Sequence, residues 1–328
     1  MAYTTINKST AHFNTKLYTG NGSARSITGV GFQPDWCWFK NRSTTNGHSI
    51  FDAVRGATKN IISNSNAAES TSSNGLTAFA SDGFSVGTDG DVNGNGNNIV
   101  SWNWKANGAG SANSDGSVSS TVSVNTTAGF SIVTWTSTGS AHTVGHGLGS
   151  TPAMIIMKGR HEANSWMVYH HKNTSAPETD YLELNSSNAT ADWTTWNDTA
   201  PTNSVFSLGT WSGNDAGGTM VAYCFTEKTG YSKFGSYEGN NNSSNNAFIY
   251  TGFKPKFLII RNADATADWV IQDNKRNPIN PREDVLLANS NVAEQDWSSY
   301  PIDLLSNGFK IRNNGQGSGT SHTFIYMA

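Results

Sequence analysis

The segment 89–94 carries oxygen-bearing side chains on alternate residues, Asp89, Asp91 and Asn93, and ends in a glycine. This pattern matches the first half of a calcium-binding loop, where side-chain oxygens at alternate positions surround the ion. The acidic residue expected at the twelfth position is missing, because Val100 stands there inside an apolar run. We therefore predict a hairpin loop shaped by Asn and Gly, with a calcium site at these three residues as the alternative.

The residues that could support catalysis are scattered along the chain. There is no Gly-x-Ser-x-Gly nucleophile elbow and no His-Glu-x-x-His zinc motif. The carboxylates that could serve glycoside hydrolysis are isolated acids, namely Asp52, Glu162, Glu178 and Glu183. A metal site would need more ligands than the three histidines His161, His170 and His171. We expect no enzyme and no catalytic residue, and we expect Asp52 to form a structural ion pair with Arg55.

The tryptophans fall into two groups. Those in short apolar runs are expected in the core, where large rings are needed: Trp36, Trp38, Trp102 and Trp166. Those in polar, turn-rich stretches are Trp193, Trp196, Trp211 and Trp297. Because indole rings stack on sugar faces, these last four are the candidate glycan-binding residues. The alternative is that each covers the hydrophobic core of its own domain.

The composition of the 328 residues excludes several classes of protein. Charged residues make up 14%, against about 25% in an average soluble protein, and aromatic residues make up 11%, too many for a disordered chain. A net charge of -3 without a basic run argues against nucleic-acid binding. No apolar stretch approaches about 18 residues, so no membrane insertion is expected. Cys37 and Cys224 stand in apolar runs and are expected as buried, free thiols.

One sequence unit recurs three times. Each copy has a proline followed by a mostly apolar run that ends in a basic residue, at 34–42, 152–160 and 255–261. A phenylalanine follows the proline after 50 residues in the first copy and after 54 in the others (84−34, 206−152, 309−255). A final aromatic residue comes 18, 17 and 17 residues later (102−84, 223−206, 326−309). Four landmarks repeated in register predict three copies of one fold.

The repeated runs are short, alternate apolar with polar residues and are bounded by Gly, Asn and Pro, which is typical of β-strands. Segments 60–63 and 284–289 fit either a helical turn or a strand. Copies two and three open with an extra strand, at 129–135 and 230–237. The number of strands predicts an all-β protein of three tandem β-sandwich domains, jelly-roll or lectin-like.

The predicted domains are residues 1–108, residues 109–228 including a linker, and residues 229–328. The Gly/Ser/Asn-rich stretch 106–115 is expected to be a linker with nothing to bury. We therefore expect the first domain to be hinged, and the second and third to be held rigidly together.

Several of these motifs resemble a repeat common in structural proteins of marine tailed phages, including phages of cyanobacteria and of abundant ocean heterotrophs. They lie at 31–36, 40–42, 51–57, 82–84 and 143–152, and the resemblance covers about residues 13–328. It implies a virion protein of the tail-fibre, tail-associated or head-decorating kind, without established catalytic residues. The sequence shows no separate anchor and no coiled or collagen-like shaft, which favours a compact appendage, fibre tip or capsid decoration.

We therefore expect a non-enzymatic structural protein on the outer surface of a tailed bacteriophage virion, contributing to host attachment. The expected partners are other virion proteins, a host-surface glycan and further copies of the chain, with a homotrimer favoured by the phage context. No cofactor is expected apart from the calcium alternative. A carbohydrate-binding adhesin is the second hypothesis, and a glycan depolymerase is the third.

Overall fold

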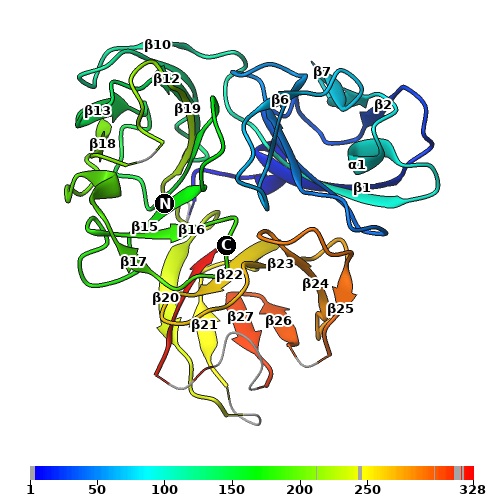
Figure 1. Cartoon of the computed structure of the whole chain (residues 1–328). Helices are drawn as coiled ribbons and strands as arrows, with labels where there is room; N and C mark the ends of the chain where they lie inside the picture. The colour runs from blue at the N-terminus through cyan, green and yellow to red at the C-terminus, as the bar shows by residue number, and fades with distance from the viewer. Residues whose placement is uncertain (1–3, 212, 243–245, 299, 314–318, 320) are drawn as a thin grey trace.

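The structure is a computed structural model that describes residues 4–211, 213–242, 246–298, 300–313, 319 and 321–328. Over these residues the protein is all-β, with antiparallel sheets and three short helices, η1 (Ser9–Ala11), α1 (Gly90–Asn93) and η2 (Thr194–Trp196). None of the helices in this part of the chain is long and apolar enough to span a membrane. The sheets fall into three groups along the chain, which we name unit 1 (residues 13–104), unit 2 (111–225) and unit 3 (234–327) (Figure 1).

Unit 1 has a six-stranded sheet of order β1-β9-β3-β4-β5-β6 and a three-stranded sheet of order β2-β8-β7. Phe39 and Phe51 of the large sheet pack against Phe84 of the small sheet, which closes a core between the two. The strands are β1 (Phe13–Thr19), β2 (Arg25–Thr28), β3 (Trp36–Asn41), β4 (Ser49–Asp52), β5 (Lys59–Ile62), β6 (Ser70–Thr71), β7 (Leu76–Ala80), β8 (Gly83–Val86) and β9 (Asn98–Trp104).

Unit 2 has an eight-stranded sheet of order β10-β11-β12-β19-β14-β15-β16-β17 and a two-stranded sheet, β13-β18. Trp135 of the large sheet packs against Phe206 of the small one, with ring centroids 5.6 Å apart. The strands are β10 (Ser111–Asn113), β11 (Ser120–Asn125), β12 (Phe130–Thr136), β13 (His142–Gly145), β14 (Met154–Gly159), β15 (Met167–His170), β16 (Asp180–Glu183), β17 (Ala191–Asp192), β18 (Val205–Leu208) and β19 (Thr219–Phe225).

Unit 3 has a six-stranded sheet of order β20-β28-β22-β23-β24-β25 and a three-stranded sheet of order β21-β27-β26. Phe309 of the small sheet packs against Tyr326 of the large one, with ring centroids 5.2 Å apart. The strands are β20 (Phe234–Glu238), β21 (Phe248–Tyr250), β22 (Phe257–Asn262), β23 (Val270–Asp273), β24 (Asp284–Leu287), β25 (Gln295–Asp296), β26 (Ile302–Leu305), β27 (Gly308–Ile311) and β28 (Thr323–Met327).

The strands predicted from the repeats are confirmed, and the ambiguous segments at 60–63 and 284–289 form strands β5 and β24. Both cysteines are buried and free, as predicted. The hairpin loop predicted at 89–94 is wrong: this segment forms the single helical turn α1. Asp89 caps that turn, because its side chain accepts the backbone N–H of Asp91 at 3.0 Å.

The expected linker at 106–115 is also different from the prediction. Ala106 is buried, and its N–H donates to the carboxylate of Asp35 at 2.7 Å. Farther along, strand β10 adds to the edge of the large sheet of unit 2 by pairing with β11. The short side chains of Ser111, Ala112 and Asn113 give no strand pattern in the sequence, because this strand is held by backbone pairing rather than by side-chain burial.

The strand register corrects one landmark of the repeat. Trp102 lies opposite Trp38 and Tyr223 lies opposite Ile156, each partner being four residues after its proline (38−34, 156−152). In unit 3 the residue opposite Ile259 (259−255) is Met327. Met327 therefore takes the place of the final aromatic residue, and Tyr326 points to the opposite face of the sheet.

The large sheets of the three units share one hydrophobic core, which we call the central core. The units form three lobes around a common centre, blue to cyan, green, and yellow to red in Figure 1. Trp36 of unit 1 stacks on Tyr223 of unit 2 at 4.5 Å, and Trp102 contacts Phe257 of unit 3 at 5.7 Å. This packing joins unit 1 to both neighbours, so the hinge expected after the first domain is not what the contacts show.

Candidate functional site

Three basic residues link the units in a cyclic manner. Each stands six residues after the proline of its repeat (40−34, 158−152, 261−255) and donates to a backbone carbonyl of a neighbouring unit. Lys40 binds Asn291 O at 2.9 Å, Lys158 binds Asn66 O at 3.2 Å, and Arg261 binds Asn188 O. The links run from unit 1 to unit 3, from unit 2 to unit 1 and from unit 3 to unit 2. The units are therefore arranged around a pseudo-threefold axis.

Buried ion pairs strengthen two of the three junctions. The predicted pair between Asp52 and Arg55 is confirmed, and both side chains are fully buried. Tyr223 of unit 2 donates its hydroxyl to the same carboxylate at 2.8 Å. In unit 3, Asp273 and Arg276 form the equivalent pair at 2.6 Å. Burial alone would raise the pKa of Asp273, but Arg276 holds it below its ordinary value.

A glutamate extends each ion pair across the junction. Glu69 accepts Arg55 of its own unit at 3.0 Å and Arg160 of unit 2 at 2.9 Å. In the same way Glu294 accepts Arg276 at 2.8 Å and forms a two-pronged pair with Arg42 of unit 1. Burial would raise the pKa of both glutamates, yet the hydrogen bonds and charges of the arginines keep it below the usual value.

In the junction between units 2 and 3 a neutral side chain takes the place of the paired aspartate, and Arg261 supplies the link to Asn188 O. His170 stands where the other units have aspartate, 18 residues after the proline (170−152, 52−34, 273−255). Its Nε2 atom lies 3.1 Å from the carbonyl of Tyr326 in unit 3. Burial, together with the neighbouring His171, lowers the pKa of His170 to about 3, so the ring is neutral at neutral pH.

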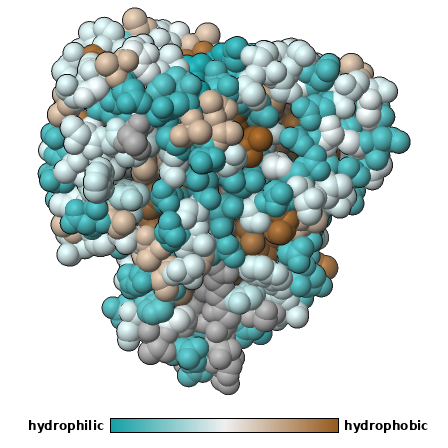
Figure 2. Space-filling model, in the orientation of Figure 1, coloured by the Kyte–Doolittle hydropathy of each residue, from teal (hydrophilic) through white to brown (hydrophobic). Residues whose placement is uncertain are grey.

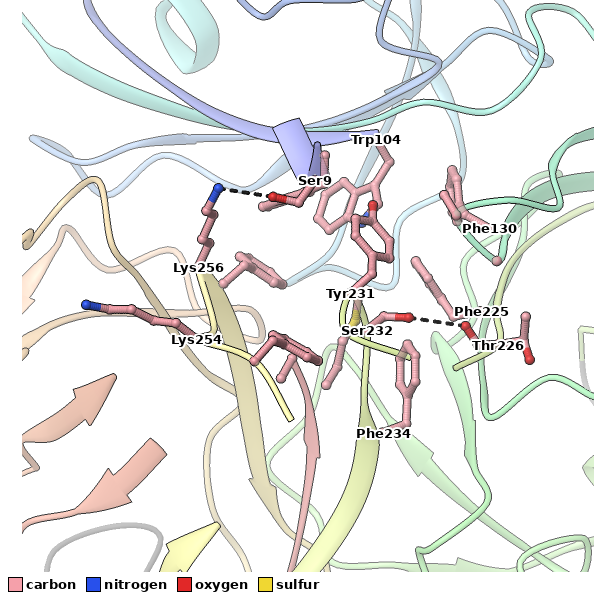
Figure 3. A pocket seen from close by; sticks show the side chains of 18 residues that line it. Ser9, Trp104, Phe130, Phe225, Thr226, Tyr231, Ser232, Phe234, Lys254 and Lys256 are labelled. Atoms are coloured by element: carbon pink, nitrogen blue, oxygen red, sulfur yellow. Dashed lines mark hydrogen bonds between the residues drawn. The ribbon is translucent and has the colours of Figure 1, made fainter. Parts of the chain in front are cut away.

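An apolar cavity of about 230 Å³ lies where strands of the three units converge near Ser9. Trp104, Phe130, Phe225 and Phe257 line it (Figure 3). Lys256 donates to Ser9 Oγ at 3.0 Å at its rim, while Lys254 points away. In Figure 2 hydrophobic residues show between the lobes, whereas hydrophilic and intermediate residues cover most of the lobes. The lining residues offer aromatic surface and no Asp or Glu side chain, so the cavity suits an apolar group.

The four candidate glycan-binding tryptophans are in different environments. Trp193 is 57% exposed and donates its indole N–H to Thr210 O at 3.2 Å. Trp297 is half-buried beside Tyr300, with ring centroids 4.9 Å apart. Trp196 and Trp211 are buried in the core of unit 2, which corrects the expectation that their rings could stack on a ligand.

The candidate calcium residues serve the local fold. The carboxylate of Asp89 caps α1 and accepts Ser72 Oγ at 2.7 Å, and the carboxylate of Asp91 accepts Asn46 Nδ2. Asn93 is fully buried, and its Oδ1 accepts the N–H of Asn21 at 3.1 Å. Each of these side chains accepts a local hydrogen bond, and the calcium alternative stays a prediction.

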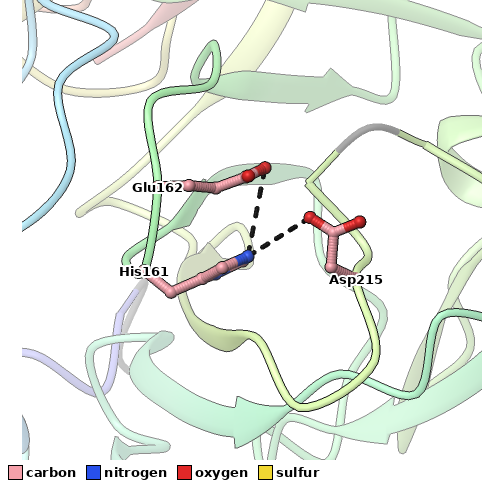
Figure 4. Close-up of side chains that lie close together, drawn as sticks. All are labelled: His161, Glu162 and Asp215. Carbon is pink, nitrogen blue, oxygen red and sulfur yellow. Dashed lines mark hydrogen bonds and ion pairs between the residues drawn. The ribbon is translucent and has the colours of Figure 1, made fainter.

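Of the three histidines singled out from the sequence, His170 and His171 lie side by side, with ring centroids 5.5 Å apart, while His161 belongs to a separate surface cluster. His161 Nε2 lies 3.3 Å from an oxygen of Asp215 and 3.9 Å from one of Glu162 (Figure 4). Nε2 of His171 lies 3.0 Å from the carbonyl oxygen of Phe234. His171 is at the other end of the β14–β15 pair from His161, because its neighbour His170 is opposite Met154 at the start of β14. No sequence pattern pointed to Asp215, because the loop that brings it to His161 is 54 residues away.

The structure also exposes two aromatic residues that we did not predict as a site. Phe248 is 46% exposed and Tyr250 is 62% exposed, while Ile249 between them is buried. The alternation of these three residues along β21 is the signal that could have identified the pair, because residues two apart in a strand face the same side.

These features define an all-β protein whose three repeated units close around one aromatic core and are joined by buried polar links. The chain belongs to a family described as a domain of unknown function (DUF7483), whose model matches residues 8–328. No curated protein and no solved structure shows a significant match to the chain.

Proposed function

We propose that this chain is a non-enzymatic structural protein on the outer surface of a tailed bacteriophage virion, built as three tandem β-sandwich domains of jelly-roll or lectin-like type. The observation that carries the proposal is the use of its buried charges. Asp52, Asp273, Glu69 and Glu294 are all engaged by arginines at or beside the junctions. A catalytic acid or base must reach its substrate, whereas these groups hold units together.

The similarity of the repeats to those of marine phage structural proteins supports the same proposal. A low charge content makes the surface depend little on ionic strength, which suits a particle exposed to seawater. The cyclic links also favour a compact appendage, fibre tip or capsid decoration over an extended fibre. Host attachment and contacts with other virion proteins are part of this proposal.

The homotrimer inferred from the phage context remains a proposal. The chain already places three units around one pseudo-threefold axis, with links that run in one direction from unit to unit. A single copy of the chain could therefore occupy a threefold-symmetric position of a fibre or capsid, and a homotrimer could occupy the same position. Sedimentation of the purified chain separates these two arrangements.

Immunogold electron microscopy tests the proposed location. Antibodies raised against the purified chain are conjugated to gold and applied to intact particles produced by cells that carry the gene. Gold on the tail supports host attachment as the main role, and gold spread over the head supports capsid decoration. Particles that carry no gold, while purified protein on the same grid is labelled, contradict a virion location.

A carbohydrate-binding adhesin is the second candidate, and the exposed ring of Trp193 is the observation that favours it. Replacing Trp193 by Ala should reduce binding of the purified protein to host cells and leave its folding intact. Unchanged binding contradicts a role for this ring. Release of soluble sugar from host polysaccharide by the purified protein would instead support the depolymerase alternative.

A further inference from the structure

We propose that the outer face of the small sheet of unit 3 binds an acidic polysaccharide. The site consists of Phe248 and Tyr250 on β21 and Lys310 on β27, which we call the aromatic face. It differs from the loop tryptophans considered above, and it goes beyond the proposed structural role because it assigns a ligand class to one lobe.

The two rings stand on one side of an edge strand. Among the described strands β21 pairs with β27 alone, and Ile249 points inward to the core that contains Phe309. Phe248 and Tyr250 therefore point outward, about 7 Å apart along the strand. The ring of Phe248 lies over Gly308: a Cβ atom added to that glycine would stand 3.0 Å from Phe248 Cζ. A side chain at position 308 would crowd this ring, and it would also collide with the backbone oxygen of Ile249 at 2.1 Å.

A cation lies beside the rings. Lys310 is directly opposite Phe248 in the strand register, and Asp303 is opposite Lys310 on the next strand. Asp303 pairs with Arg312 at 3.3 Å. No carboxylate of the described residues lies within ion-pairing distance of Lys310, so its ammonium group can pair with an anionic ligand.

Units 1 and 2 show that the fold does not require these rings. The strand registers place Ser26 and Thr28 of unit 1 at the positions of Phe248 and Tyr250. In unit 2 the same positions hold Thr143 and Gly145. Inward-facing residues at the intervening position are apolar in all three units: Ile27, Val144 and Ile249. The aromatic face is therefore specific to unit 3, and its exposed rings are not explained by packing.

The size and charge of the face indicate what it binds. The exposed parts of the two rings amount to on the order of 200 Å², well below the roughly 800 Å² that each partner buries in a stable protein interface. An area of this size matches one or two sugar rings, whose C–H faces stack on aromatic side chains. Lys310 adds a preference for a carboxylate or sulfate group, which an acidic polysaccharide supplies.

Affinity electrophoresis of the full chain tests the site with three acidic polysaccharides, polygalacturonate, alginate and dextran sulfate, and with neutral dextran as the control. We expect retardation by at least one acidic polymer, weakened at high salt. The double variant Phe248→Ser/Tyr250→Thr, which carries the residues of unit 1, should bind at least 10-fold more weakly. Lys310→Ser introduces the residue type of Ser85, which holds this position in unit 1, and should lose the preference for acidic over neutral polymer.

The control variant Lys172→Ser removes an exposed lysine of unit 2, outside the aromatic face, and should retain the binding of the wild-type protein. Thermal unfolding checks the fold of each variant, and the single change Tyr250→Thr replaces the double change if the latter fails to fold. Lack of retardation by all three acidic polymers, or equal affinity of the wild-type and aromatic variants, overturns the proposal. Because the assay uses purified protein, its result is independent of the gold labelling that tests the virion location.

Discussion

The indole N–H of Trp102 in unit 1 donates to the carboxylate of Asp273 in unit 3 at 3.0 Å, although 171 residues separate them in the chain. The same carboxylate holds Arg276, whose guanidinium lies 5.7 Å from the centre of the Trp102 ring. One buried carboxylate therefore binds both an arginine of unit 3 and a core tryptophan of unit 1. These contacts join unit 1 to unit 3, which do not follow each other in the chain, and so complete the ring of three units.

A double-mutant cycle should detect this coupling. Trp102→Phe removes one donor to a buried carboxylate and should cost about 1–3 kcal/mol in the free energy of unfolding. Asp273→Asn leaves Arg276 buried without its counter-charge and should cost about 3–5 kcal/mol. The double variant should show a non-additive term of about 0.5–3 kcal/mol in urea unfolding.

Trp36→Phe is the matched control, because Trp36 is buried in the same central core and its indole nitrogen has no hydrogen-bond partner among the described residues. Combined with Asp273→Asn, it should give a nearly additive result. Additive behaviour of the Trp102 cycle as well would show that the hydrogen bond contributes nothing beyond packing.

The three units should unfold together in one calorimetric transition, because their large sheets share the central core. Arg42→Ala removes the two-pronged pair with Glu294, so it should lower the unfolding free energy by about 1–3 kcal/mol while the transition stays single. Arg312→Ala, which removes a more exposed ion pair, should change it by less than about 1 kcal/mol. Separate transitions, of which Arg42→Ala shifts only one, would indicate independent units.

Stability should fall as the pH decreases below about 6.5, the ordinary pKa of histidine. Burial lowers the pKa of His170 to about 3 and that of His146 to about 4 in the folded protein. Between these values and 6.5 the unfolded chain binds more protons than the folded one. Each histidine therefore removes up to about 1.4 kcal/mol of stability per pH unit as the pH falls.

Urea unfolding between pH 7 and pH 4.5 measures this slope. His170→Gln keeps a side-chain N–H for the carbonyl of Tyr326 but does not titrate. The fall in its unfolding free energy per pH unit should therefore be smaller than that of the wild-type protein, by the equivalent of up to one bound proton. A His170→Gln variant with the slope of the wild-type protein would contradict the prediction.

The contribution of Lys158 to the free energy of unfolding should increase at alkaline pH. Its Nζ donates to Asn66 O at 3.2 Å and to Asn164 O at 2.8 Å, and burial lowers its pKa to about 8. Lys158→Met should therefore destabilise the protein by about 1–3 kcal/mol at pH 7, because carbonyls lose their donor.

The pH dependence of this difference follows from the direction of the shift. Between pH 8 and the ordinary lysine value of 10.5 the unfolded chain binds more protons, so folding becomes more favourable as the pH rises. The advantage of the wild-type protein over Lys158→Met should grow between pH 8 and pH 10, measured by chemical unfolding. A constant difference would show that Lys158 stays charged in the folded protein over this range.

Two neighbouring tryptophans should respond differently to replacement by alanine. Trp193 is 57% exposed and Trp196 is 1% exposed, although both belong to the same polar stretch of sequence. Trp196→Ala should cost about 3–5 kcal/mol, because it leaves a cavity beside Tyr169. Trp193→Ala should cost less than about 1 kcal/mol, and thermal unfolding of the two variants makes the comparison.

Much of the local structure could be predicted from the repeats. The period of two in 204–209, the prolines before β3, β14 and β22, and the glycines between strands are all local signals. The strands predicted from the repeats therefore lie where the structure has them. The ion pair of Asp52 and Arg55 was also predictable from its three-residue spacing. Its counterpart, Asp273 with Arg276, has the same spacing from its proline, and comparison of the copies at this position would have identified it.

Other features depended on contacts that the sequence pattern does not express. Trp196 lies in a polar stretch of sequence, but it is buried because the turn η2 folds onto the core of unit 2. The segment that forms β1 was not recognised as a strand from the sequence. It is held in place by its pairing with β9, which is distant in the chain.

The sequence by itself determined the all-β class, the threefold repetition and the position of most strands, because these depend on residue spacing within about ten positions. The tertiary structure decided which faces meet. The approach of Trp102 to Asp273, the sharing of one core by three units and the exposure of Phe248 and Tyr250 all depend on segments distant in the chain. A strand pattern shows that one face will be buried, but the partner that buries it is selected by packing among all three units.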